Sequence, residues 1–377
     1  MFSRLSAESV LPLPRMAMAA KAGHASMQTP KVAWRVDDLN PAAWDAFAAQ
    51  FDDVSFDQCA LYTEHQWPAR TNRIQVFENG LPIGGAVIVV VTPPLLKSGL
   101  AYVKAGPFWR QRGTALDIGR YETVIGAVVE EFARRRGHHL TVLPRATPGF
   151  AALEENALER LGFAMLRPMT DPNRYLVRTT LSEDDQLKSM AQKWRYNLRK
   201  SWKNKFEIVK GDSLDEIGTF RALHARMRGR KRLGAHEPVG LIPDLVAQLP
   251  SALRPTIYLT YHEGKPVSGA VITHHGDTSY YVFGATADEA LPLKAGYALQ
   301  WAIIRDLRDT RVQWYDLGGE ANSQGLLQFK KGLVGREGEI VSMTGEFEYS
   351  GSVSGTSVSK LLFAARAAKR FVKERSK

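Results

Sequence analysis

The sequence predicts an α/β (α+β) protein with two similar domains in tandem, each a mixed, mainly antiparallel sheet flanked by helices. The main observation is that one order of elements, strand–turn–strand–strand–helix–strand–helix, occurs twice along the chain. The length of 377 residues is sufficient for two or three domains. The composition is that of a folded chain, because 44% of the residues are hydrophobic and 24% are charged.

The first copy of this order lies between residues 73 and 161. Apolar runs bounded by turn residues predict its strands. The expected strands are 73–77, 83–91, 102–103 and 140–143. Apolar residues at helical spacing predict a helix from about 117 to 136, which ends at Gly137. A shorter helix is expected around 153–161.

The second copy lies between residues 256 and 331 and repeats the same order. The expected strands are 256–261, 266–273, 279–283 and 312–316. A helix is expected over about 294–308, because Tyr297, Trp301 and Ile304 fall on one face. A glycine loop and a short helix near 324–331 complete the copy.

Two helices are expected between the copies. One covers about 184–204, and the other begins at Ser213, where Ser213 and Glu216 have the spacing of a capping box. The predicted organisation is a flexible tail over 1–30, a first domain over 31–183 and a second domain over 184–350. A basic amphipathic helix over 356–377 follows.

The net charge of +11 is concentrated in three segments. Residues 186–210 hold eight Lys or Arg and one Glu, residues 220–232 hold six and no acid, and residues 356–377 hold seven and one Glu. Such local fields indicate an anionic partner. The candidates are tRNA phosphate, a nucleotide or pyrophosphate-linked sugar, and anionic lipid. The last helix would suit peripheral contact with a membrane, and a helix docked on the second domain is the alternative.

The single cysteine, Cys59, excludes an internal disulfide and a thiolate metal cluster, and we expect no metal site. Residues 1–31 lack the apolar run of a secretory signal, and the stretch 83–96 is too short to span a bilayer. We therefore expect a cytoplasmic protein, with peripheral contact at the inner face of the plasma membrane as an option.

The most informative motif follows the last strand of the second copy. Residues 314–320 read Trp-Tyr-Asp-Leu-Gly-Gly-Glu, and residues 325–332 read Gly-Leu-Leu-Gln-Phe-Lys-Lys-Gly. Two glycines let the backbone approach a ligand closely, and a lysine just beyond them has the chemistry to stabilise an oxyanion or a phosphate. A plain glycine turn followed by solvated lysines is the alternative.

These two segments, together with Gly345-Glu346-Phe347, resemble the C-terminal signature of the FemABX aminoacyltransferases, a branch of the GNAT superfamily. Residues 193–200, 279–284 and 299–301 are similar to the basic helix, a strand and a helix of that family. In the first half, the similarity extends to 102–107. The resemblance covers about residues 50–350.

The resemblance implies two GNAT-like domains and transfer of an amino acid from aminoacyl-tRNA to a peptide amine of a nucleotide- or lipid-linked peptidoglycan precursor. It assigns oxyanion stabilisation to Lys330, and it places Phe329 and Tyr281 in the active site. We add Glu320 as a candidate acceptor of the amine proton. The residues expected to contact substrates are Arg195, Arg199, Lys203, Arg230, Arg232, Tyr280, Trp301, Gly318, Gly319 and Lys331.

Two other functions stay open. The first is a GNAT N-acyltransferase, which would use acyl-CoA or an acyl carrier protein. Gly296 and Ala298 fit the start of the helix that binds pyrophosphate in that superfamily. Leu293 replaces the first polar residue of that motif. The family's Arg-Gly-Pro element has Ala105 in place of its arginine, which affects the expected acceptor more than the chemistry. The second alternative is a non-catalytic module that binds RNA or membrane through its basic segments.

Overall fold

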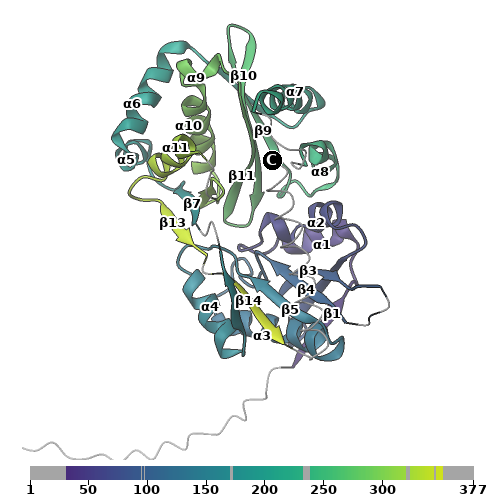
Figure 1. The fold of residues 1–377 in the computed structure, drawn as a ribbon. Helices are drawn as coiled ribbons and strands as arrows, with labels where there is room; N and C mark the ends of the chain where they lie inside the picture. The colour runs from purple at the N-terminus through teal and green to yellow at the C-terminus, as the bar shows by residue number, and fades with distance from the viewer. Residues whose placement is uncertain are drawn as a thin grey trace, which may run out of the picture.

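The structure is a computed structural model, and it describes residues 31–94, 96, 98–169, 173–231, 238–319, 323–343 and 345–350. The predicted tail over 1–30 and the predicted helix over 356–377 lie outside these residues. The described residues form two seven-stranded sheets flanked by helices, one in each half of the molecule (Figure 1).

The first sheet has the strand order β1-β2-β3-β4-β5-β14-β6. Its strands are β1 (Val32–Val36), β2 (Thr71–Glu78), β3 (Leu81–Val91), β4 (Leu100–Lys104), β5 (His139–Leu143), β6 (Ala164–Pro168) and β14 (Gly345–Ser350). All neighbours are antiparallel except β4 and β5, which are parallel. The four strands expected here from the sequence are confirmed.

The helices of the first half are α1 (Pro41–Ala48), α2 (Ala60–Gln66), α3 (Ile118–Val128) and α4 (Ala151–Arg160). Helix α3 continues as a π-helical stretch over Val129–Arg135, so the helix expected over 117–136 is confirmed. Its apolar side chains, among them Tyr121 and Phe132, are fully buried against the sheet. Burial of this apolar face is one source of the favourable free energy of the first core.

The second sheet has the strand order β13-β7-β12-β11-β10-β9-β8. Its strands are β7 (Asn173–Arg178), β8 (Glu207–Gly211), β9 (Thr256–His262), β10 (Lys265–His275), β11 (Thr278–Thr286), β12 (Trp314–Asp316) and β13 (Glu339–Ser342). The parallel pair is β11 and β12, and the other pairs are antiparallel. The series β9 to β12 therefore repeats the pairing of β2 to β5, as the repeated order of elements predicts.

The helices of the second half cover both faces of this sheet (Figure 1). They are α5 (Glu183–Ser189), α6 (Gln192–Ser201), α7 (Leu214–Lys231), α8 (Ile242–Gln248), α9 (Ala290–Leu293), α10 (Ala295–Arg308) and α11 (Gln324–Val334). Helices α6, α10 and α11 lie on one face, and α7 and α8 lie on the other. None of the helices in the described part of the chain has the length and apolarity needed to cross a bilayer.

The expected capping box of the second basic helix is confirmed. Glu216 accepts hydrogen bonds from the backbone N–H of Ser213 at 3.0 Å and from its hydroxyl, and the Glu216 N–H donates to the Ser213 hydroxyl at 3.4 Å. Two of the first turn's otherwise unpaired polar groups are satisfied in this way. Helix α7 therefore begins where the sequence predicts.

The single helix expected over 184–204 is wrong, because the chain forms two helices that break at Met190. Met190 has extended backbone angles, and the N–H of Ala191 donates to the carbonyl oxygen of Gly332 at 3.0 Å. The guanidinium of Arg195 donates to the carbonyl oxygens of Leu187 and Met190, at 3.2 and 2.6 Å. The Arg195 guanidinium satisfies carbonyls that are left free at the end of α5, and Gly332 satisfies the N–H of Ala191, so both contacts stabilise the break.

The two sheets exchange one strand each. Strand β7 follows β6 in the sequence but inserts between β12 and β13 of the second sheet, and β14 returns from the end of the second half to insert between β5 and β6 of the first. The expected division at residue 183 therefore separates the two copies of the element order but not the two sheets. As limits of independent domains, the ranges 31–183 and 184–350 stay a prediction.

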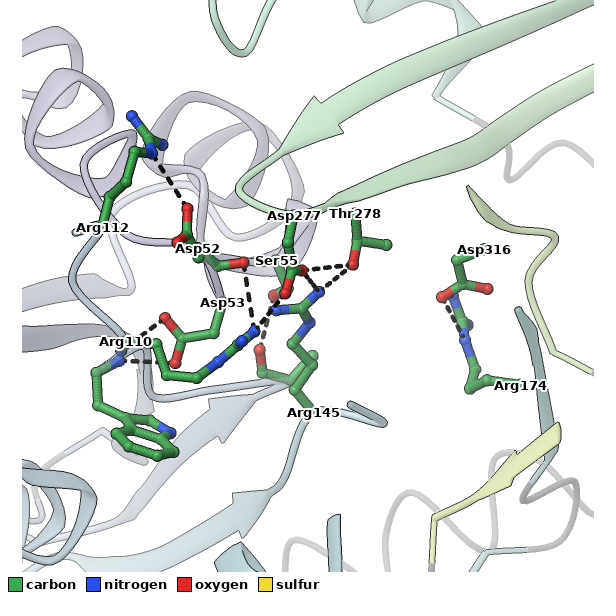
Figure 2. Close-up of polar contacts among 12 residues, drawn as sticks. Asp52, Asp53, Ser55, Arg110, Arg112, Arg145, Arg174, Asp277, Thr278 and Asp316 are labelled. Carbon is green, nitrogen blue, oxygen red and sulfur yellow. Dashed lines mark hydrogen bonds and ion pairs between the residues drawn. The ribbon is translucent and has the colours of Figure 1, made fainter. Parts of the chain in front are cut away.

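A buried ionic network joins the halves (Figure 2). Asp277, in the turn between β10 and β11, accepts hydrogen bonds from Arg110 at 2.8 Å and from Arg145 at 3.3 Å, both in the first half. Burial alone would raise the pKa of Asp277, but the charges of Arg145 and Arg110 outweigh it and hold this pKa below its usual value. The Asp277 N–H also donates to the Asp52 carbonyl at 2.9 Å.

Gly276 gives a direct test of this joint. Its φ of +61° favours glycine, and a Cβ at this position would lie 2.2 Å from the carbonyl oxygen of Asp52. Gly264, in the turn between β9 and β10, has a similar φ of +72°, but a Cβ there would meet no atom within 4 Å. We expect Gly264→Ala to cost about 1–2 kcal/mol from backbone strain. Gly276→Ala should cost about 1–3 kcal/mol more, because the halves must separate.

Thermal unfolding of the two variants beside the parent protein measures this difference. Equal losses of stability for Gly276→Ala and Gly264→Ala would show that the contact with Asp52 does not hold the halves together.

Candidate active site

A cavity of about 430 Å³ lies between the two sheets. Strand β11 contributes Tyr280 and Tyr281, the end of β12 contributes Asp316, and the loop after it contributes Gly318. Arg174 on the exchanged strand β7 lines the same cavity. The first half contributes Lys104 and Arg145, which lie at or just after the carboxyl end of a strand. A space of this size suits a small-molecule or peptide substrate.

Asp316 organises the loop beside the cavity. Its Oδ2 accepts two hydrogen bonds from Arg174, at 3.1 and 2.8 Å, and its Oδ1 accepts the N–H of Gly318 at 2.7 Å. The residue is 4% exposed. Gly318 has a φ of +84°, a conformation that glycine adopts without strain, and this turns the chain directly after the strand. A buried charge with these partners fixes the loop in one geometry.

Lys330 projects from α11 toward this loop. Its Nζ donates to the carbonyl oxygen of Gly319 at 2.7 Å, and a Cβ on Gly318 would lie 3.6 Å from it. The residue is 8% exposed. Burial, followed by the charge of Arg174, lowers the pKa of Lys330 to about 8, although Asp316 acts in the opposite direction. At neutral pH this amine is a cation in a poorly solvated place, which suits it to stabilise a developing negative charge.

The predicted aromatic residues occupy different places. Tyr281 lines the cavity, and its hydroxyl lies over Gly284, where any Cβ would overlap it. Tyr280 also lines the cavity, and burial raises its pKa to about 12. Phe329 instead packs against Trp194 and Tyr297, with ring centroids 5.7 and 4.9 Å apart. This cluster holds α11, and therefore Lys330, against α6 and α10.

Three other predicted residues are structural or lie away from the cavity. Trp301 is 6% exposed in the core of the second half. Gly296 and Ala298 lie in the first turn of α10, which follows Lys294 in a left-handed conformation. Neither residue lines the cavity between the sheets. Glu320 lies outside the described residues, directly after Gly319.

A second, more open cavity of about 760 Å³ lies between α5, α6 and α11. Arg195, Arg199 and Lys331 line it, so the structure brings these three predicted residues together. The guanidinium of Arg195 caps the end of α5, which commits it to backbone carbonyls. Arg199 and Lys331 are exposed and supply the accessible positive charge of this basic groove. Lys203 is exposed in the 3₁₀ turn after α6.

The second basic cluster, in residues 220–232, is separate from this groove. Helix α7 carries it on the opposite face of the second sheet from α6 (Figure 1). Arg232 and the side chain of Arg230 lie outside what the structure describes. The two basic helices expected from the sequence therefore face different sides of the second half.

Arg174 and Arg145 are functional candidates that the sequence reasoning missed. Arg174 precedes the expected domain boundary, and only the strand exchange brings it to Asp316. Arg145 follows β5 and is 5% exposed, with hydrogen bonds to Asp277 and to the hydroxyl of Thr278 at 2.6 Å. A signal existed for Arg145, since ligands in open α/β sheets bind beyond the carboxyl ends of strands.

Comparison with known proteins places this geometry in a class. Residues 188–331 match the family model described as an acetyltransferase (GNAT) domain. A lipid II:glycine glycyltransferase of Staphylococcus saprophyticus is 32% identical over 101 residues, which is 25% of this chain and 24% of that protein. A UDP-N-acetylmuramoylpentapeptide-lysine N(6)-alanyltransferase of Weissella viridescens is 26% identical over 145 residues, or 38% of this chain and 42% of that protein.

Solved structures show the same fold. The crystal structure of FemX matches with a TM-score of 0.68 and 16% identity, over 84% of this chain and 97% of that one. The structure of L-PGS from Bacillus licheniformis matches with a TM-score of 0.53 and 12% identity, over 84% and 94%. At these identities the likeness concerns the fold.

The chain therefore has a GNAT domain, and the predicted fold class of two GNAT-like halves is confirmed. Within that class, the predicted resemblance to the FemABX aminoacyltransferases is confirmed as well. The aligned regions span only about a quarter and two-fifths of the two curated relatives, 24% and 42% of their lengths.

The contact between Arg174 and Asp316 predicts a change in the pKa of Lys330. Arg174→Gln removes the nearby positive charge that lowers this pKa and leaves Asp316, which raises it. We expect the pKa of Lys330 to rise from about 8 toward the ordinary lysine value. NMR titration of the lysine side-chain signals measures it, with Lys330→Met to assign the signal.

Arg178→Gln is the matched control, because Arg178 lies on the same strand but pairs with the carbonyl oxygen of Glu337. An unchanged pKa in Arg174→Gln, or the same rise in both variants, would contradict the assigned electrostatics.

Proposed function

We propose that this protein is an aminoacyltransferase that moves an amino acid from aminoacyl-tRNA to an amine of a peptidoglycan precursor or a similar peptide. The observation that carries the proposal is Lys330, a cation that is 8% exposed and donates to the carbonyl oxygen of Gly319, the residue that follows Gly318 in the wall of the cavity between the sheets. The names of the two curated relatives, which transfer glycine and alanine, support the choice of reaction.

The chemistry asks for orientation and charge stabilisation more than for a nucleophilic side chain, because an ester donor is already activated. The neutral amine attacks the ester carbonyl, and a bond forms between nitrogen and carbon. The carbonyl oxygen becomes an oxyanion, which the ammonium of Lys330 stabilises. The carbon–oxygen bond to the ribose then breaks, the nitrogen loses a proton and the ribose oxygen gains one. We keep Glu320 as the proposed acceptor of the amine proton.

The two cavities suit two substrates. We assign the acceptor to the cavity between the sheets, where Tyr280 and Tyr281 shape the wall. We assign phosphates of the donor to the basic groove, through Arg199 and Lys331. Helix α11 separates them, since Lys330 faces the loop of the first and Lys331 lines the second. A nucleotide- or lipid-linked acceptor would place the protein in the cytoplasm, with peripheral contact at the membrane.

The direct test is transfer by the purified protein. Radiolabelled aminoacyl-tRNA is incubated with a UDP-linked muramoyl pentapeptide or with its lipid-linked form, and the product is identified by mass spectrometry. We expect a new amide on the acceptor peptide. Transfer from an acyl-CoA donor, with none from aminoacyl-tRNA, would instead establish the GNAT N-acyltransferase alternative, which the matched family model favours. RNA binding without transfer from either donor would indicate the non-catalytic alternative.

Removal of Lys330 should affect the chemical step. We expect Lys330→Met to lower kcat about 10²–10³-fold with little change in KM, because loss of one oxyanion donor has an effect of this size. Lys331→Met removes the same charge from the exposed neighbour and should raise KM for the donor, while kcat is kept. Lys265→Met, at an exposed position at the start of β10 that lines neither cavity, controls for charge alone. Undiminished turnover in Lys330→Met would overturn the role.

The pH dependence follows from the same lysine. Its pKa of about 8 means that the charge is present below pH 8 and is lost as the pH rises through that value. We expect kcat to rise with pH while the acceptor amine loses its proton and to fall above about pH 8. Lys330→Arg keeps its charge, so the falling limb should disappear even if the maximum is lower. A falling limb that persists in Lys330→Arg would assign it to another group.

A further inference from the structure

Two large aromatic side chains lie exposed on one basic helical segment. Tyr196 on α6 is 66% exposed, and Trp202 in the 3₁₀ turn that continues it is 49% exposed. The opposite side of the same segment anchors it, because Trp194 and Leu198 are buried in the core of the second half. The fold therefore fixes the segment that carries these two rings. The rings themselves are not part of that core, so packing in the core does not explain why they are aromatic.

Cations alternate with these rings. Residues 192–205 include six Lys or Arg residues and no acidic residue. Arg199 is three residues from both Tyr196 and Trp202, so it lies between them on the helix surface. Lys203 is exposed beside Trp202. No ion pair joins Arg199, Lys200 or Lys203 to a carboxylate among the described residues.

The pattern fits a nucleic acid better than a membrane. A helix that lies in a bilayer interface needs a continuous apolar face. The exposed residues of this segment instead include Lys193, Arg199, Lys200 and Lys203, and its aliphatic Leu198 is buried. Isolated aromatic rings separated by cations are the arrangement that binds single-stranded nucleic acid, because bases stack on the rings and phosphates pair with the cations.

The location also fits. Arg199 belongs both to this segment and to the basic groove, whose far wall includes Lys331 on α11. Helices α6 and α11 are in contact, since a Cβ on Gly332 would lie 3.2 Å from the Trp194 ring. A strand that lies along α6 and enters the groove would thus reach Lys331, which follows Lys330, the proposed catalytic cation, in the sequence.

We propose that α6 and the turn after it form a binding surface for unpaired nucleotides, in which Tyr196 and Trp202 stack on bases while Arg199 and Lys203 contact phosphates. This surface would hold the single-stranded end of the donor RNA. Its identity as the donor site rests on the proposed function, but the binding itself is measured without any transfer reaction.

The test is fluorescence anisotropy of the full chain with a labelled single-stranded RNA decamer that ends in CCA. A blunt RNA duplex of the same sequence is the second probe, because it offers phosphates but no free base faces. We expect Tyr196→Ala and Trp202→Ala each to weaken single-strand binding by about fivefold or more, with little effect on the duplex. Arg199→Ala should weaken both probes and lower the salt dependence by about one ion.

Controls separate stacking from general damage. Tyr196→Phe keeps the ring and should bind like the parent protein, and Trp67→Ala removes an exposed aromatic ring, 38% exposed, from the first half and should also bind normally. Equal loss for single strand and duplex in Tyr196→Ala, or no loss for either, would overturn the proposal. The proposal would also fail if the two alanine variants kept RNA binding and instead lost binding to vesicles of anionic phospholipid.

The experiments distinguish failure of the proposed RNA-binding surface from failure of the proposed function. If the decamer binds as described but no aminoacyl transfer occurs, the RNA surface stands and the enzymatic proposal fails. If transfer occurs and both aromatic variants bind and turn over normally, the surface proposal fails alone.

Discussion

The carboxylate of Asp316 is the contact on which the candidate site depends. It lies at the end of β12, a short interior strand of the second sheet, and it accepts hydrogen bonds from Arg174 and from the N–H of Gly318 at the same time. Arg174 is present only because β7 leaves the first half of the chain and pairs with β12. The loop that receives Lys330 is therefore fixed by a strand from the other copy of the fold. Removing the charge of Arg174 or of Asp316 would leave the other charge buried without its partner. This is among the more costly changes in a protein core.

The exchange of β7 and β14 has a second consequence, because it ties the halves together at two places. Each sheet is complete only when both halves are folded, so the cavity between them has walls of fixed relative position. The ionic network at Asp277 reinforces this arrangement. Asp53, which is buried beside it, accepts the N–H groups of Trp109 and Arg110 at 2.8 and 3.0 Å, and burial raises its pKa. Such a closely coupled network favours one orientation of the halves and so keeps the substrate-sized space open between them.

How much of this the sequence predicts depends on the range of the interactions involved. The repeated strands and the helices α3 and α10 were predictable, since their apolar periodicity is local and is read within a few turns or pleats. The capping box at Ser213 is local too. The partners of β7 and β14 were not predictable, because they pair with strands more than a hundred residues away and no local pattern encodes that choice. The break at Met190 was missed because the Gly332 carbonyl, one of the groups that stabilise it, comes from outside the predicted helix. The motif at 314–320 located the loop, but not the arginine that holds it.

The state of Lys330 links the fold to the chemistry. A lysine is rarely buried unless it is paired, and here the contact found within the described residues is one hydrogen bond to a backbone carbonyl rather than an ion pair. Its charge is therefore incompletely compensated, and burial, followed by the charge of Arg174, lowers its pKa to about 8. An ammonium that was fully paired with a carboxylate would gain little from a new anion, whereas this one gains most when an oxyanion forms beside it. In the proposed reaction, formation of the oxyanion would relieve the cost of holding this under-solvated cation, and departures from local rules are expected at functional sites.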